Sequence, residues 1–305
     1  MVITDLQRKM EGGLSFHEAM AKHPKVFSAL WINLVESGEA SGNLAVVLNR
    51  LAGYLERNAA FRNKVISALV YPVILLLAGT AALLFLSLWI IPTFAKVFQG
   101  LNIKLPMLTI FLVNMSTFLK NYFLIIIVAL GFGGWAIYRY INTRTGRRNF
   151  ENFLFDLPMV GEFFSALVVE RFTSEMSTLV ESGVPILYSL EIAEHSVDNL
   201  VLSEIIRKVN EDVRQGKPLS QPLEKSGFFD PMAVQMIAIG EEIGELSNMF
   251  KRLNTFYQEY VDTFLVRFIS LFEPVMLVFM GAVIGTIVIG MFLPIFQIAT
   301  VGQKM

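Results

Sequence analysis

The chain has 305 residues, of which 54% are hydrophobic and 17% charged, with a formal net charge of −1. Few soluble domains are so apolar, and the near-neutral charge gives no sign of a nucleic-acid partner. The absence of cysteine excludes disulfides and thiolate metal sites, and three scattered histidines do not form a metal-binding pattern. We therefore expect no metal and no cofactor.

The N-terminal segment, residues 1–64, is polar and predicts a first helical domain. Ser15 followed by Glu18 is the pattern of a helix capping box. Ser41 or Asn43 is placed to start a long helix that runs toward the membrane.

Residues 65–91 predict the first transmembrane helix. Pro72 and Pro92 lie 20 positions apart, and a helix covers roughly 30 Å in that interval, the thickness of the hydrocarbon core of a bilayer. No charged residue occurs from Tyr71 to Ala95, although a buried helix of a soluble protein would need polar residues. We interpret the two prolines as the start and stop of the helix. They could also contribute to helix packing, or kink the helix where a substrate slides past.

Residues 92–120 form a connecting segment, and residues 121–141 predict a second span with aromatic residues near its ends, where amphipathic rings prefer the membrane interface. Residues 142–272 predict a second helical domain, residues 273–296 a third span with Pro274 in the position of Pro72, and residues 297–305 a tail. Six helices are expected in the second domain: about Phe163–Glu181, one from Pro185, one from Asp198 or Asn199 to Gln215, one from Ser220, one from Asp230 and Pro231, and one from about Glu245 toward the membrane.

Basic residues indicate the orientation of the spans, because they accumulate on the cytoplasmic side. They precede the first span, follow the second and precede the third: Arg50, Arg57, Arg62, Lys64, Arg139, Arg144, Arg147, Arg148, Lys251, Arg252 and Arg267. The segments 92–120 and 297–305 carry fewer. We expect both helical domains and the N-terminus in the cytoplasm, and the C-terminus on the other side.

The chain contains a direct repeat with an offset of 202 residues. Gly38 and Glu39 align with Gly240 and Glu241, and the register holds without a gap from about residue 27 to residue 96. Each copy is a polar helical domain followed by an outgoing membrane helix. A second outgoing helix requires a return span, which explains the odd number of three spans.

Residues equivalent to 163–207 have no counterpart before Met1. Half a bundle would leave the apolar faces of residues 27–35 and 44–55 exposed to water. We therefore expect a truncated form of a longer chain. The expected fold is an all-α membrane protein with two tandem helical-bundle cytoplasmic domains, the first truncated at its N-terminus, and three transmembrane helices.

Residues 64–92 read KVISALVYPVILLLAGTAALLFLSLWIIP, and a G-E-x-x-G-x-L element occurs at 38–44 and again at 240–246. In combination these motifs resemble the type II secretion system protein F family, which includes the inner-membrane platform proteins of type IV pilus assembly. The resemblance covers essentially the whole chain. Two departures are the missing N-terminal helices and Glu273, which stands where the first copy has Tyr71.

The resemblance implies a non-enzymatic platform in the bacterial inner membrane, with the segments 92–120 and 297–305 in the periplasm. Such a platform connects a cytoplasmic hexameric assembly ATPase to pilin or pseudopilin subunits that enter a filament, among other inner-membrane components. We also expect a homodimer and no nucleic-acid partner. The sequence agrees with the lack of catalysis, since it contains no G-x-x-x-x-G-K-[ST], H-E-x-x-H, G-x-S-x-G or G-x-G-x-x-G.

The G-E-x-x-G-x-L element has two interpretations. In the structural one, Gly38 and Gly240 end a helix in the left-handed conformation, and the glutamate after each lies near the N-terminus of the next helix, where negative charge is favourable. In the functional one, four glutamates present an acidic edge to a basic partner: Glu39, Glu241, Glu242 and Glu245.

Candidate residues also lie in and beside the third span. Glu273 either caps the helix begun by Pro274 or pairs with Arg267, or else it receives the positively charged N-terminal end of a pilin-like helix. Gly281 and Gly285 form a G-x-x-x-G step, which allows close helix contact within one protomer or across a dimer.

A membrane transporter and a membrane-anchored signalling protein are the alternative function classes. A transporter needs polar groups at mid-membrane, where these spans offer only Thr80, Ser87 and Thr286. Binding to an assembly ATPase would separate the platform from both alternatives.

Overall fold

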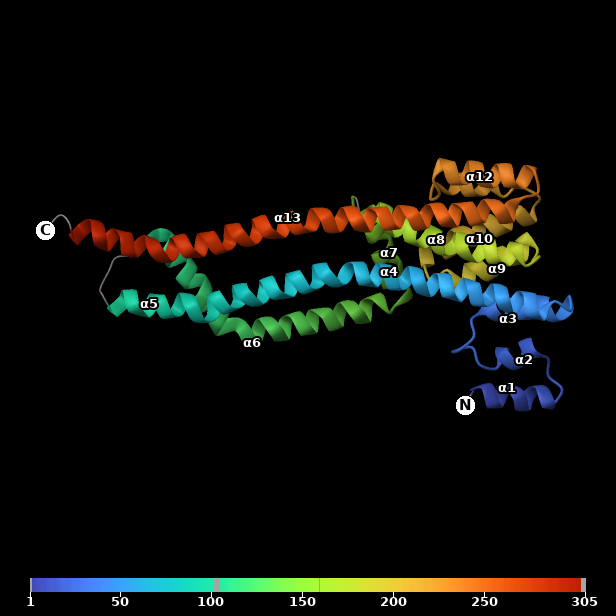
Figure 1. Ribbon diagram of the computed structural model, residues 1–305, viewed down its shortest axis with the longest axis horizontal. Helices are drawn as coiled ribbons and strands as arrows, with labels where there is room; N and C mark the ends of the chain where they lie inside the picture. Colours follow the sequence, from blue (N-terminus) through green and yellow to red (C-terminus); the bar gives the residue numbers. More distant parts are fainter. Residues whose placement is uncertain (1, 101–104, 159, 303–305) are drawn as a thin grey trace. The chain divides into compact units, whose positions relative to one another are not determined.

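The computed structural model describes residues 2–100, 105–158 and 160–302, and every regular element in these ranges is a helix (Figure 1). In this part of the chain, three helical segments are long and apolar enough to cross a membrane: Leu44–Phe98, Met107–Ile141 and Leu246–Phe296. The bent pair formed by α7 (Arg144–Asp156) and α8 (Val160–Glu181) would count as a fourth, but α8 is a buried helix of a helical unit. The all-α fold with three spans is confirmed.

The chain divides into two compact units. Unit 1 comprises Met1–Lys64 and Ile141–Phe264, and unit 2 comprises Val65–Tyr140 and Leu265–Met305. Two helices, α4 (Leu44–Phe85) and α13 (Leu246–Gly302), belong to both units, because each runs without interruption across the boundary.

In unit 1, the first copy of the repeat supplies α1 (Val2–Glu11), α2 (Phe16–Ala21), α3 (Ala29–Ala40) and the beginning of α4. The predicted capping box is present: the Ser15 hydroxyl accepts from the backbone N–H of Glu18, whose carboxylate accepts from the N–H of Ser15. Of the two predicted starts of the long helix, Asn43 is correct, since α4 begins at Leu44.

The second copy supplies the six expected helices: α8, α9 (Ile186–Ser196), α10 (Leu200–Arg214), α11 (Ser220–Ser226), α12 (Pro231–Glu242) and α13. Asn199 rather than Asp198 caps α10, through its side-chain oxygen and the N–H of Leu202 at 2.8 Å. Helix α7 precedes these helices and was not expected.

Helix α8 is the centre of unit 1. Its residues 172–179 are all buried, and a stretch of more than two turns covers every face of a helix. On one side the ring of Phe172 lies 5.6 Å from that of Phe229 and 6.1 Å from that of Phe250, both from the second copy. About two turns further along, at Leu179, α8 packs against the first copy.

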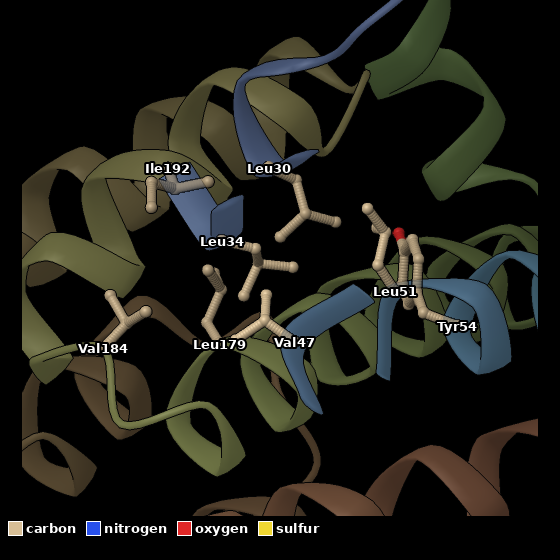
Figure 2. Close-up of a cluster of buried hydrophobic side chains, with 8 residues drawn as sticks. All are labelled: Leu30, Leu34, Val47, Leu51, Tyr54, Leu179, Val184 and Ile192. Carbon is tan, nitrogen blue, oxygen red and sulfur yellow. The ribbon is translucent and has the colours of Figure 1, made fainter. Parts of the chain in front are cut away.

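Figure 2 shows this second contact, a cluster of buried side chains from α3, α4, α8, α9 and the turn between α8 and α9. Its members come from both copies: Leu30, Leu34, Val47, Leu51, Tyr54, Leu179, Val184 and Ile192. The apolar faces of residues 27–35 and 44–55 are therefore covered by α8 and α9, and the expectation that they would be exposed was wrong. The two copies share one core.

In unit 2, the prolines lie inside helices. Pro72 lies within α4 and both Pro274 and Pro294 lie within α13, so the interpretation of these prolines as helix starts and stops was wrong. A proline removes one backbone donor, and membrane helices tolerate this loss because neighbouring groups and local adjustments compensate for it. Helix α6 (Met107–Ile141) begins well before residue 121, and none of its most apolar 18-residue window is buried, as expected for a surface that contacts lipid.

The three long helices of unit 2 meet beyond the end of α4. The chain there forms a π-helix, η1 (Leu86–Ile90), followed by α5 (Ile91–Gly100). A π turn releases a backbone carbonyl from the α-helical pattern, and the hydroxyl of Ser116 in α6 donates to the carbonyl of Ser87. The hydroxyl of Thr109 donates to the carbonyl of Gly290 in α13, which joins α6 to the third helix.

Candidate functional site

The repeated G-E-x-x-G-x-L element joins two helices in each copy. In the first, Glu39 in the last turn of α3 accepts from the backbone N–H groups of Phe16 and His17 at 2.8 and 3.1 Å and contacts the His17 Nδ1 at 2.6 Å. In the second, Glu241 in α12 accepts from the N–H groups of Leu219 and Ser220 at 2.6 and 3.3 Å. Each glutamate therefore caps the N-terminus of a preceding helix, α2 or α11, in space.

These contacts set the charge state of Glu39. Burial raises its pKa, but the hydrogen bonds from the His17 ring and from the N–H groups of His17 and Phe16 together lower the pKa below its ordinary value. The ionised form of the carboxylate is thus stabilised in the folded state.

The predicted role of Gly38 and Gly240, to end a helix in the left-handed conformation, was wrong. Gly38 and Gly240 lie inside α3 and α12, and the left-handed residues are Gly42 and Gly244, with φ of 71° and 74°. A Cβ atom on Gly38 would lie 3.1 Å from Val47, and on Gly240 it would lie 2.6 Å from the Met249 side chain. The first glycine therefore allows close packing of the next helix, and the second ends the helix.

The predicted acidic edge divides into engaged and exposed residues. Glu39 and Glu241 are partly buried and bind helix N-termini, whereas Glu242 and Glu245 are exposed. The Glu245 carboxylate, directly before α13, accepts from the side-chain amide of Asn248 in the first turn of that helix. The two exposed glutamates are the part of the edge that is open to a partner.

Glu273 lies in the middle of α13 and does not cap a helix, because α13 continues through Pro274. Among the described residues, Glu273 and Arg267 form no ion pair within 4.0 Å. The phenol of Tyr71 lies beside the Glu273 carboxylate instead. These two residues occupy equivalent positions in the two copies. Glu273, the residue that differs from the first copy, therefore lies next to its own counterpart.

Gly281 and Gly285 face open space, since a Cβ atom at either position would meet nothing within 4 Å. Within the described part of the chain the G-x-x-x-G step therefore packs against no other helix. Gly290 behaves differently, because a Cβ atom there would lie 2.4 Å from a methyl carbon of Leu112. Gly290, rather than the predicted pair, allows α6 and α13 to approach closely.

Unit 2 contains an apolar cavity of about 540 Å³ between α4, α6 and α13. The three mid-membrane residues named in the sequence, Thr80, Ser87 and Thr286, all line it, and the rest of the lining is apolar. The Thr286 hydroxyl donates to the carbonyl of Ala282 in its own helix. The cavity contains no charged lining residue that would hold an ion.

Comparison with known proteins decides the family. The family model of type II secretion system (T2SS) protein F matches residues 1–92 and 172–294. The chain belongs to the type II secretion system protein F family. The two matched segments correspond to the two copies of the repeat, and with its three apolar helices this family member is an inner-membrane protein.

Curated relatives match almost the whole chain. The type IV pilus assembly protein PilC of Thermus thermophilus is 38% identical over 97% of this chain and 73% of its own length. PilC of Pseudomonas aeruginosa is 30% identical over 98% of this chain and 80% of its own length. The type II secretion system protein F of Xanthomonas campestris pv. campestris is 32% identical over 97% of this chain and 73% of its own length.

Sequence reasoning missed two buried carboxylates of α8, which are features of the protein F fold in this chain. Glu175 is 2% exposed and its carboxylate contacts the Ser196 hydroxyl and, at 3.7 Å, the Arg171 guanidinium. Glu170 accepts from the side-chain amides of Asn254 and Gln258 at 3.0 and 2.8 Å. The sequence contained little indication of this burial, because a glutamate in a helix is usually expected to be exposed to solvent.

Proposed function

We propose that this chain is a non-enzymatic inner-membrane platform of a type IV pilus or type II secretion machine. In this role it couples a cytoplasmic hexameric assembly ATPase to the insertion of pilin or pseudopilin subunits into a filament. Membership of the protein F family and the printed names of the relatives, type IV pilus assembly protein and type II secretion system protein F, support the machine role.

The observation that carries the coupling proposal is the continuity of α4 and α13. Each begins in the helical unit 1 and continues without a break into an apolar membrane segment. Because α8 packs against both helices in one shared core, a movement imposed on unit 1 acts on both helices together. We propose that unit 1 is cytoplasmic and that the segments 92–120 and 297–305 are periplasmic.

The exposed glutamates of the acidic edge are proposed to bind a basic surface of the ATPase. The double variant Glu242→Lys with Glu245→Lys is expected to weaken ATPase binding to the purified chain at least about tenfold, since rim charges fix complementarity and encounter. Both side chains are exposed, so helical circular dichroism and thermal unfolding should stay unchanged. Binding is measured with the purified ATPase and the chain in nanodiscs.

Glu211→Lys is the matched control, because Glu211 is an exposed glutamate of α10 in the same unit. It should leave ATPase affinity within about twofold of the unmodified chain, as expected for an exposed charge outside an interface. ATPase binding that survives in the double variant would contradict the proposed surface. A transporter or signalling protein would show no ATPase binding even in the unmodified chain.

Glu273 is proposed to receive the positively charged end of a pilin-like helix at the membrane boundary. Glu273→Gln is expected to reduce filament assembly in cells about tenfold, because it removes a charge but keeps the size of the side chain. Tyr71→Phe is the matched control, since it removes the hydroxyl group beside Glu273 and leaves the charge. Normal assembly in Glu273→Gln, with the protein present at its usual level, would contradict this role.

The other proposed partner is a second copy of the chain. A homodimer would give Gly281 and Gly285, which face open space in one copy, a helix to pack against, while Pro72 and Pro274 lie at equivalent positions of the two long helices. The apolar cavity of unit 2, with no charged lining residue, does not favour a transporter.

A further inference from the structure

Unit 1 contains a second cavity, which is polar and belongs to none of the surfaces described above. It has a volume of about 210 Å³ and lies between α4, α8 and α13. Pockets between domains or repeats are common places for ligands. This one lies at the junction of the two copies, because it is lined by Asn49 and by the residue equivalent to it in the second copy, Lys251.

Three cations line this cavity: Arg50 and Arg57 from α4 and Lys251 from α13. Among the described residues, no carboxylate lies within the 4.0 Å of an ion pair from any of them. Arg50 donates to the backbone carbonyl of Glu181, and the side chain of Glu181 is the one carboxylate that lines the cavity. The lining therefore has an excess of positive charge that the fold itself does not neutralise.

The guanidinium of Arg57 lies beside a glycine one turn before it. A Cβ atom on Gly53 would lie 3.4 Å from the Arg57 Nη1, so the guanidinium folds back over the bare backbone of α4. Both residues line the cavity. A larger residue in place of Gly53, such as the threonine that stands at position 255 in the second copy, would crowd this conformation.

The remaining polar lining supplies hydroxyl groups and amides. Ser174 and Ser177 of α8 line the cavity with hydroxyls that can donate hydrogen bonds, whereas the hydroxyl of Thr178, which also lines it, already donates to the Ser174 carbonyl at 2.9 Å. The amides of Asn254 and Gln258 also line it, but they donate to the carboxylate of Glu170 and so are already engaged. Cations at three corners with hydroxyl donors between them are the arrangement that recognises a phosphate group.

We propose that this cavity binds the phosphate group of a small anionic ligand, held by Arg57 from the first copy and Lys251 from the second. The cavity is smaller than the sites that enclose drug-sized ligands, so it takes a free phosphate or pyrophosphate, or one phosphoryl group whose remainder lies outside. The bound anion bridges α4 and α13, the two helices that continue into the membrane. This inference is independent of the proposed ATPase contact.

The test uses the full chain in nanodiscs of zwitterionic phosphatidylcholine, with pyrophosphate titrated by calorimetry. We expect saturable binding, weakened about tenfold by Arg57→Gln and about tenfold by Lys251→Gln, because each removes one charged contact. Arg252→Gln is the matched control, since Arg252 is the exposed neighbour of Lys251 and does not line the cavity. Its affinity should be unchanged, and all variants should unfold at the temperature of the unmodified chain.

A second arm identifies the source of the phosphate. Nanodiscs that contain phosphatidylglycerol are compared with the phosphatidylcholine nanodiscs: competition with pyrophosphate would assign the site to a lipid headgroup, and unchanged affinity would assign it to a soluble phosphate. Either result supports the site if Arg57→Gln and Lys251→Gln each weaken binding about tenfold. The proposal is overturned if neither phosphatidylglycerol nor pyrophosphate binds the folded chain, or if Arg252→Gln weakens binding as much as Lys251→Gln.

Discussion

Glu175→Gln is expected to raise the free energy of unfolding by about 3 kcal/mol at pH 8 and by less than about 1 kcal/mol at pH 5. Glu175 is 2% exposed, and burial raises its pKa to about 7 from an ordinary value of 4.5, despite hydrogen bonds from Ser196 and the nearby charge of Arg171. Below pH 4.5 the carboxyl is neutral in both states. Between pH 4.5 and 7 the unfolded chain has lost the proton and the folded chain keeps it, so stability falls as pH rises, and above pH 7 the full cost remains.

Glutamine removes this dependence because it stays neutral at every pH and can still accept from the Ser196 hydroxyl. The measurement is denaturant unfolding of the chain in detergent micelles at several values between pH 5 and pH 8. Glu181→Gln is the matched control, since Glu181 is an exposed glutamate of the same helix, and its effect should stay within about 0.5 kcal/mol at both extremes. An equal effect of Glu175→Gln at pH 5 and pH 8 would contradict the assigned cause.

The helix ends that could be predicted from the sequence are those fixed by neighbouring residues. The Ser15 capping box, the Asn199 cap and the proline before α9 depend on contacts within a few positions, and the structure contains all three. Gly183 and Gly216, which follow the predicted ends of two helices, have positive φ. Local chemistry was sufficient at these places because no distant residue competes for the same backbone groups.

The roles of Glu39 and Glu241 could not be predicted in the same way. Each lies more than 20 positions from the N–H groups that it binds, at separations of 22 and 23 residues for Glu39 and of 21 and 22 for Glu241. The local capping rule placed each glutamate at the N-terminus of the helix that follows it. In the folded chain each glutamate instead binds the N-terminus of the helix that precedes it. The repeat showed that the G-E-x-x-G-x-L element occurs in both copies, but it did not show which residues the element contacts.

The core that the two copies share could not be predicted from the repeat either. Comparing the copies suggested that the first one lacks helices, since the residues equivalent to α8 and α9 are absent before it. The structure shows that α8 and α9 pack against both copies. In α8, serine, threonine and glutamate are buried beside apolar residues. The threonine hydroxyls and the buried carboxylates have partners, such as the Thr173 hydroxyl, which donates to the Val169 carbonyl at 2.9 Å. Such a helix has no clear polar face to identify it as central.

Two substitutions about two turns apart along α8 test whether the copies unfold together. Phe172→Ala removes a ring from the contact with the second copy, and Leu179→Ala removes a side chain from the cluster with the first. Both residues are fully buried, so we expect losses of about 3–5 kcal/mol for Phe172→Ala and about 2–5 kcal/mol for Leu179→Ala. The measurement is thermal unfolding combined with amide hydrogen exchange read separately in the two copies.

If α8 couples the copies, either substitution lowers protection in α3 and in α12 by the same amount, because a shared core opens as one unit. Ile239→Ala on the exposed side of α12 is the control and should change stability by less than about 1 kcal/mol. Independent copies would give a different pattern, in which Leu179→Ala loosens α3 alone and Phe172→Ala loosens α12 alone. That pattern would remove the physical basis for unit 1 acting on α4 and α13 together.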